Sequence, residues 1–167
     1  MNALMIVLRW LHIFSAVYWA GAGLAFTFVI SPAVAATGDA GRQFVGHLMT
    51  KTKFSLSMTI AGITTVLAGS TMYVIDSGAE GWANSSSGIA FGIGGVFGIA
   101  ALAFGIMIPK LNGAMGKLGA QIQGKPTAEQ AAQMEALRKR ITAISYTNAA
   151  CLILATTLMA TARFIRF

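Results

Sequence analysis

The sequence predicts an all-α protein: a four-helix transmembrane bundle with helical extensions on the cytoplasmic side. Two observations carry this prediction, namely an unusually apolar composition and four hydrophobic segments long enough to cross a bilayer. Of the 167 residues, 56% are hydrophobic and only 10% are charged, whereas a soluble domain carries about 25% charged residues. The mean hydropathy is +0.69. The lipid bilayer is therefore the expected surrounding of this chain.

The four hydrophobic segments cover residues 4–31, 54–75, 88–109 and 141–164 of one integral membrane domain, 1–167. A single helical span needs about 20 apolar residues. Backbone groups in hydrocarbon must be satisfied internally, and no alternating barrel pattern is present, so the spans are expected to be helices. The first segment is too long for a signal peptide, whose apolar core is about 7–15 residues, and is interpreted as a true span.

The first two spans have recognisable ends. We expect the first helix to stop at Ser31 and Pro32, followed by a loop over residues 33–41. From Arg42 the pattern is again helical, so the second helix is expected to begin outside the membrane. Its far end is a short polar turn, after which Trp82 is placed as an interfacial anchor.

The last two spans are joined by the longest connection. The third helix is rich in glycine and is expected to end at Pro109. Thr127 followed by Gln130 matches a capping box, which predicts a helix that starts there and continues unbroken into the fourth span.

Basic residues predict the orientation. Nine of the twelve lie in the first and third connections: Arg42, Lys51, Lys53, Lys110, Lys117, Lys125, Arg138, Lys139 and Arg140. The positive-inside rule then places both termini outside a cell inner (cytoplasmic) membrane. The same rule accounts for the net charge of +7, so no nucleic-acid partner is expected.

The first span contains ionisable residues at membrane depth. Arg9 and His12 lie within the apolar run 4–30, and such residues mark functional sites by default because burying them in lipid is costly. A membrane histidine can ligate haem, bind copper, relay protons or hydrogen-bond a neighbouring helix as packing glue. The residues alone leave these alternatives open.

The stretch Arg9-Trp10-Leu11-His12, followed by Trp19-Ala20-Gly21 and Ser31-Pro32, resembles the opening helix of a superfamily of small membrane proteins. Its members are the copper-resistance D family, the HemJ-type protoporphyrinogen oxidases and the membrane domain of a haem-linked urate oxidase. Residues 53–69 are similar to the second helix of the copper-resistance group. The resemblance marks His12 as the functional histidine and implies haem or copper chemistry.

The helical rise places other candidate ligands relative to His12. His47 lies on the opposite side of the membrane, more than roughly 30 Å away, which excludes a two-histidine site within one subunit. Residues 67–73, 94–98 and 156–161 share the depth of His12, and Met72 and Met159 lie in or near this layer. Thioether sulfur pairs with imidazole on haem and on copper, although methionine is also a common apolar filler.

Three glycines of the third span, Gly94, Gly95 and Gly98, lie at the same depth. They leave room for a flat macrocycle, or they allow close helix packing through small-residue spacing. Arg9, one turn from His12, is suited to pair with a haem propionate or to reach a lipid phosphate. Trp19 shares the face of His12 and is expected inside the bundle as part of the site.

The leading functional prediction is a membrane haem-b-binding or redox protein with His12 as axial ligand, near the outer membrane surface. One alternative is a cofactor-free accessory or assembly subunit of a larger membrane complex, and another is a copper-handling protein. No span contains a carboxylate, and no hydrolytic machinery, broken helix or inverted repeat is evident. Faces of small residues also suggest a homo-oligomer.

Overall fold

The computed structural model describes residues 3–122 and 124–166 and confirms the all-α bundle. Four helical stretches are long and apolar enough to cross a membrane: Ala3–Thr37, Phe54–Ser77, Ser86–Ala120 and Ala128–Thr161. The elements in chain order are α1 Ala3–Ala25, η1 Phe26–Ile30, α2 Ser31–Thr37, α3 Asp39–Lys51, α4 Phe54–Ser77, η2 Trp82–Asn84, α5 Ser86–Ala120 and α6 Ala128–Thr161. The described ranges contain no strand.

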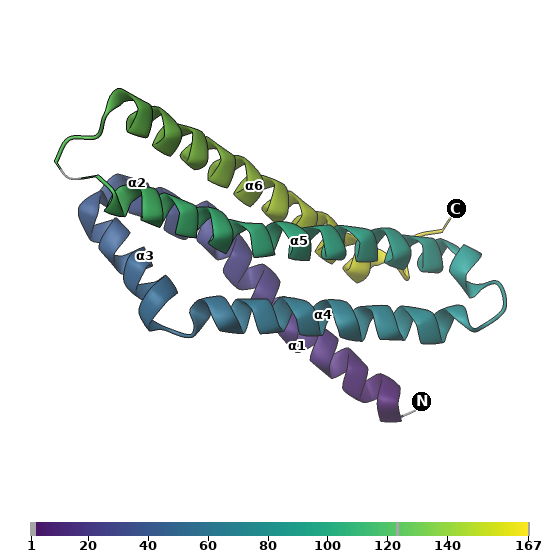
Figure 1. Ribbon diagram of the computed structural model, residues 1–167. Helices are drawn as coiled ribbons and strands as arrows, with labels where there is room; N and C mark the ends of the chain where they lie inside the picture. The colour runs from purple at the N-terminus through teal and green to yellow at the C-terminus, as the bar shows by residue number, and fades with distance from the viewer. Residues whose placement is uncertain (1–2, 123, 167) are drawn as a thin grey trace.

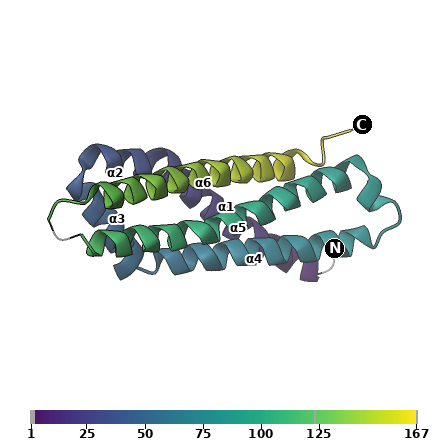
Figure 2. The same cartoon turned by 45° about the horizontal axis from the view of Figure 1, so that its top comes forward.

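Both ends of the described chain lie at the same end of the bundle (Figures 1 and 2). We call this the terminal end, and it also holds the turn between α4 and α5. At the opposite end, which we call the extension end, lie α2, α3 and the connection from α5 to α6. A chain that crosses a membrane an even number of times begins and ends on the same side, so the two ends are expected together.

The helices pack in the order α1, α4, α5, α6, and α6 closes back onto α1. The contact between α5 and α6 is the most extensive, whereas α1 meets α6 over a shorter length. Figure 1 shows the reason, since α1 crosses α4 obliquely and its first half runs away from α5 and α6. The backbones of α1 and α5 do not approach each other, so these helices lie diagonally across the bundle.

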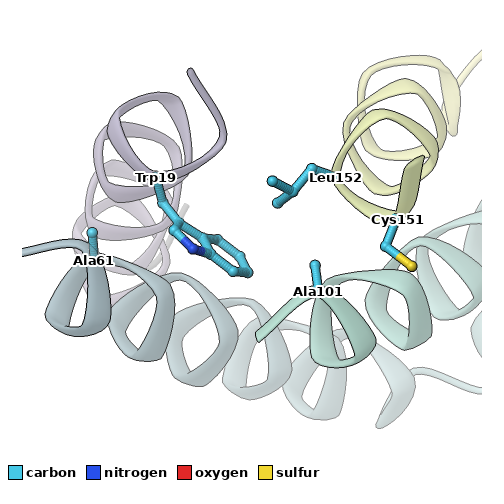
Figure 3. Close-up of a cluster of buried hydrophobic side chains, with 5 residues drawn as sticks. All are labelled: Trp19, Ala61, Ala101, Cys151 and Leu152. Carbon is cyan, nitrogen blue, oxygen red and sulfur yellow. The ribbon is translucent and has the colours of Figure 1, made fainter. Parts of the chain in front are cut away.

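Trp19 forms the centre of the packing. Its side chain is 6% exposed, and its indole points between the helices toward Ala101 and Leu152 (Figure 3). Gly62 of α4 makes room for it, because a Cβ there would lie 3.0 Å from Trp19 Cε2 and 3.0 Å from Leu102 Cδ1. Large side chains from α1 and α5 thus meet at a glycine of α4, and the burial of Trp19 confirms that it lies inside the bundle.

The prediction that the first helix stops at Pro32 is wrong. The chain passes through a π-helical turn, η1, in which the Ser31 N–H donates to the Phe26 carbonyl, and it continues as α2 to Thr37. Pro32 occupies the first turn of α2, a helix position in which proline is favoured. The predicted loop over residues 33–41 is reduced to a turn at Gly38, which has a φ of 60°.

The helical extension before the second span exists, but it is a separate helix rather than a continuation. Thr52 adopts an extended conformation after α3, and α4 begins at Phe54. The α2–α3 hairpin is tightly closed, since a Cβ on Gly41 would lie 2.7 Å from the Val34 Cα.

The third helix also continues further than predicted, because α5 runs through Pro109 to Ala120. A proline inside a helix removes one hydrogen bond without necessarily ending it, and spanning helices tolerate this. The capping box is confirmed: Thr127 Oγ1 accepts from the Gln130 N–H at 3.2 Å, and Gln130 Oε1 accepts from the Thr127 N–H at 3.0 Å. From there α6 is continuous to Thr161.

Aromatic rings pack together in a layer near each end of α4. At the extension end Phe26 stacks on Phe54 with centroids 6.2 Å apart. At the terminal end Tyr73 packs edge-to-face on Trp82 at 5.3 Å, and Trp82 stacks on Phe91 at 6.3 Å. Phe54 and Tyr73 both belong to α4 and are about 28 Å apart along its axis. This separation matches a hydrocarbon thickness of about 30 Å.

Candidate functional site around His12

His12 is fixed against α4 by a hydrogen bond to the backbone. Its Nδ1 lies 2.8 Å from the carbonyl oxygen of Thr65. A carbonyl oxygen only accepts, so Nδ1 carries the proton and donates it. In the neutral ring Nε2 then keeps an available lone pair.

Gly69 supplies the surface on which the imidazole rests. A Cβ at this position would lie 2.8 Å from Cε1 and 2.9 Å from Nδ1 of His12, so the ring lies directly on the α4 backbone. Sequence reasoning identified neither Thr65 nor Gly69 as part of the site. Their spacing of four residues was the available signal, because it repeats small residues on one helix face.

Hydroxyl groups extend this contact into a polar seam between α1 and α4. The hydroxyl of Thr65 lies 2.9 Å from Ser15 Oγ and also 2.8 Å from the Ala61 carbonyl. Further along, the Tyr18 hydroxyl lies 2.7 Å from Ser57 Oγ. In hydrocarbon these bonds replace water as partners, so the seam fixes the position of α1 on α4.

The contacts with Thr65 and Gly69 place His12 near the terminal end of α4. Gly69 precedes Tyr73 by four residues and Thr65 precedes it by eight, which places His12 roughly 6–12 Å inside the terminal aromatic layer.

Nε2 of His12 has no hydrogen-bond partner within residues 3–122 and 124–166. His12 as a whole is half-buried. A ligating histidine characteristically donates its other ring N–H to a carbonyl or carboxylate, which fixes the ring and raises the basicity of the ligating nitrogen. The bond from His12 to Thr65 has this form.

The three candidate glycines do not gather around His12. Gly94 packs on α6, where its Cβ would lie 3.3 Å from Leu158 Cβ and 3.3 Å from Met159 Cε. A Cβ on Gly95 or Gly98 would have nothing within 4 Å, so both border open space. Met159 therefore fills the contact between α5 and α6.

The remaining candidates are dispersed. Arg9 is half-buried on α1 and makes no ion pair among the described residues. Met72 is half-buried on α4, one turn beyond Gly69. His47 is exposed on α3, at the extension end, as the depth argument expects.

Asn148 is a buried polar residue that sequence reasoning missed. It is 6% exposed, and its Oδ1 has no partner among the described residues. This oxygen lies 4.0 Å from where a Cβ on Gly105 would be, in the contact between α5 and α6. Its signal was available, because Asn148 is the single side-chain amide within 141–164.

Across the described ranges, no three His, Cys, Asp or Glu side chains come together in a group that could hold a metal. Comparisons with protein families, with curated proteins and with solved structures find no match for this chain. The fold and the helices define its class, a multi-pass α-helical membrane protein.

Proposed function

We propose that this chain is a membrane haem-b-binding or redox protein in which His12 is an axial ligand. One observation carries the proposal: the Thr65 carbonyl holds Nδ1–H of His12 at 2.8 Å, while Nε2 has no hydrogen-bond partner among the described residues. Haem bound there would supply one-electron chemistry. The chain would contribute the ligand, its orientation by Thr65 and an apolar surrounding.

The donor set fits one axial bond. Arg9 lies one helical turn from His12 on nearly the same face, which suits a propionate, or a lipid phosphate if the side chain extends to the interface. Met72 and Met159 are the candidate thioethers for the opposite side. Because Met159 packs against Gly94, its use as a ligand requires a change of rotamer, and a group from outside this subunit is the other source.

The proposed location is the cell inner membrane, with both termini outside. The support is the distribution of basic residues, since the extension end carries Lys51, Lys53, Lys117 and most of the other cations. Positively charged segments are retained on the cytoplasmic side. The proposed haem site at His12 would then lie near the outer membrane surface.

A cofactor-free accessory subunit is the second candidate, and a specific observation favours it. His12 already joins two helices, through its bond to Thr65 and its contact with Gly69. Such a histidine stabilises the bundle without any ligand. Exposed apolar side chains on α1, such as Phe14 at 73% and Val17 at 68%, would then contact lipid or a partner subunit.

A visible absorption spectrum of the protein purified from haem-supplied cells separates these functions. We expect a Soret band in the natural sequence and in His47→Ala, whose histidine is exposed at the extension end, and its loss in His12→Ala. Absence of the band from the natural sequence, or its persistence in His12→Ala, contradicts the proposal. Stoichiometric copper without a Soret band would indicate the copper-handling alternative instead.

Gly95→Leu tests the predicted macrocycle space independently. Nothing lies within 4 Å of a Cβ at this position, so the variant is expected to fold normally. Loss of haem in Gly95→Leu would show that the macrocycle extends over this face of α5. Retention would limit the haem site to the neighbourhood of α1 and α4.

A further inference from the structure

A pocket of about 330 Å³ lies where the first helical stretch separates from α6, toward the extension end. The two helices touch at Gly23, where a Cβ would lie 3.1 Å from Leu152 Cδ1. Further along, η1 still meets α6, whereas α2 does not approach it. Tyr146 of α6 lines the pocket and packs edge-to-face on Phe28 at 5.9 Å. The pocket therefore fills the space that opens between η1 and α6.

Hydroxyl groups dominate the walls of this pocket. Five of its seven lining residues carry one: Thr27, Ser31, Thr142, Ser145 and Tyr146. The Thr27 hydroxyl donates to the Gly23 carbonyl at 3.0 Å. The other four hydroxyls make no hydrogen bond within residues 3–122 and 124–166. Serine and threonine in helices often bond back to the preceding turn, so these hydroxyls keep donors and acceptors for a ligand.

The backbone adds an acceptor to the same space. In an α turn or a π turn, the Thr27 carbonyl would accept from the N–H of residue 31 or residue 32. The Ser31 N–H donates to the Phe26 carbonyl instead, and Pro32 has no N–H. A helical carbonyl points along the axis toward those two residues, and both line the pocket. The Thr27 carbonyl therefore faces the pocket without a helical donor.

The lining determines the chemistry of a ligand. The pocket has no charged side chain in its walls, so nothing there would compensate a buried charge. A carbonyl oxygen only accepts, whereas a hydroxyl donates or accepts. The ligand must then be neutral and must bring a hydrogen-bond donor for Thr27. Ser31, Thr142 and Tyr146 are exposed, so the pocket can be entered from outside the bundle.

We infer that this pocket binds the ring of a lipid-soluble quinol. One ring hydroxyl donates to the Thr27 carbonyl, the ring oxygens accept from the hydroxyls of α6, and Tyr146 places an aromatic ring beside them. The choice of a quinol among neutral hydroxyl-bearing lipids rests on the proposed function, because a redox protein of the bilayer requires an electron carrier that dissolves there. Thr27 is about 22 Å along the helix axis from His12, so the two sites are separate.

Calorimetric titration of the detergent-solubilised protein with decylubiquinol under anaerobic conditions tests the pocket, with protein-free micelles as the blank. Thr142→Phe places a ring in the pocket. Thr147→Phe is the matched control, because Thr147 is also exposed on α6 and does not line the pocket. We expect binding to weaken several-fold in Thr142→Phe and to stay unchanged in Thr147→Phe. Equal binding by the two variants overturns the inference.

A smaller change tests the hydroxyl groups without filling the pocket. Ser31→Ala with Ser145→Ala removes two unpaired hydroxyls from the lining and should weaken decylubiquinol binding several-fold. The control, Ser55→Ala with Ser70→Ala, also changes one half-buried and one exposed serine, but neither lines the pocket. Unchanged binding in the first pair would contradict the role of the hydroxyls and overturn the inference.

The Thr27 carbonyl predicts a preference for the reduced ring. Decylubiquinol carries hydroxyl donors and decylubiquinone carries none, so the quinol should bind several-fold more tightly. Pro32→Ala adds an N–H that can donate to this carbonyl and should remove the preference, whereas Pro109→Ala adds one in α5 and should keep it. No preference in the natural sequence, or tighter binding of dioleoylglycerol than of the quinol, overturns the inference.

The two proposals fail separately. His12→Ala should bind decylubiquinol as the natural sequence does, because the pocket lies toward the other end of the bundle. Quinol binding without a Soret band would contradict the proposed haem function alone. A Soret band without quinol binding would overturn the quinol site alone.

Discussion

His12 donates its Nδ1 proton to the Thr65 carbonyl at 2.8 Å, and it reaches that oxygen because Gly69 has no side chain. In an α-helix the carbonyl of residue 65 also accepts from the N–H of residue 69, so the imidazole adds a second donor to one oxygen. Thr65 and Gly69, four residues apart, together form the acceptor site on α4 for a histidine of α1.

Gly69→Ala should displace the imidazole. The new Cβ would lie 2.8 Å from Cε1 of His12, closer than packed atoms tolerate, and overpacking typically costs about 1–3 kcal/mol. Gly98→Ala is the matched control, since nothing lies within 4 Å of its Cβ. Thermal unfolding in detergent should show a lower midpoint for Gly69→Ala alone. Equal midpoints would mean that His12 moves aside freely.

Gly62→Ala should disrupt the centre of the bundle. Its Cβ would meet Trp19 Cε2 and Leu102 Cδ1, each at 3.0 Å, so both side chains cannot keep their positions. Gly21→Ala makes the same chemical change where nothing lies within 4 Å. We expect the fluorescence of Trp19 and the unfolding midpoint to change in Gly62→Ala. Unchanged values in both variants would contradict this account of the packing.

The sequence predicted the four spans because hydropathy over about 20 residues depends on composition alone. It predicted the start of α6 because a capping box is local, formed by Thr127 and Gln130. It missed the passage through Pro32 and Pro109, because a proline removes a hydrogen bond without determining whether neighbouring turns absorb the loss. At Pro32 the π turn η1 absorbs it.

The site was predictable in depth but not in its contacts. His12 stood out as an ionisable residue in an apolar run, and its partners on α4 depend on the crossing of two helices, which no local pattern fixes. The glycines show the same limit. Gly94, Gly95 and Gly98 share a depth, yet a Cβ on Gly94 would meet α6 while one on Gly95 or Gly98 would meet nothing within 4 Å, a difference that depth along the helix does not predict.

Thr127→Ala should loosen the start of α6. The substitution removes the hydroxyl that accepts from the Gln130 N–H, and losing such a cap costs about 1 kcal/mol. Faster hydrogen exchange is expected at residues 128–132 and nowhere in the bundle core. Thr147→Ala, which removes a hydroxyl bonded to Ala143 in mid-helix, should leave those amides unchanged. Equal exchange in both variants would argue against the cap.

A pair of reporters should establish the orientation. The reporter is an enzyme that is active only in the cytoplasm. Placed at Gly124, in the connection between α5 and α6, it is expected to be active. The same reporter fused to the C-terminus should be inactive, because both ends of the described chain lie at the other end of the bundle. The reverse pattern would invert the topology and with it the placement of His12 near the outer surface.

Asn148→Leu should leave the protein as stable as before or more stable. The side chain is 6% exposed and its Oδ1 lacks a partner among the described residues, and burying an unpaired polar group costs about 1–3 kcal/mol. Leucine has nearly the same size, so it fills the contact with Gly105 without leaving a cavity. Asn148→Ala, which does leave one, should unfold at a lower temperature. A lower unfolding midpoint for Asn148→Leu would instead show that the amide has a stabilising partner, such as a bound water, between α5 and α6.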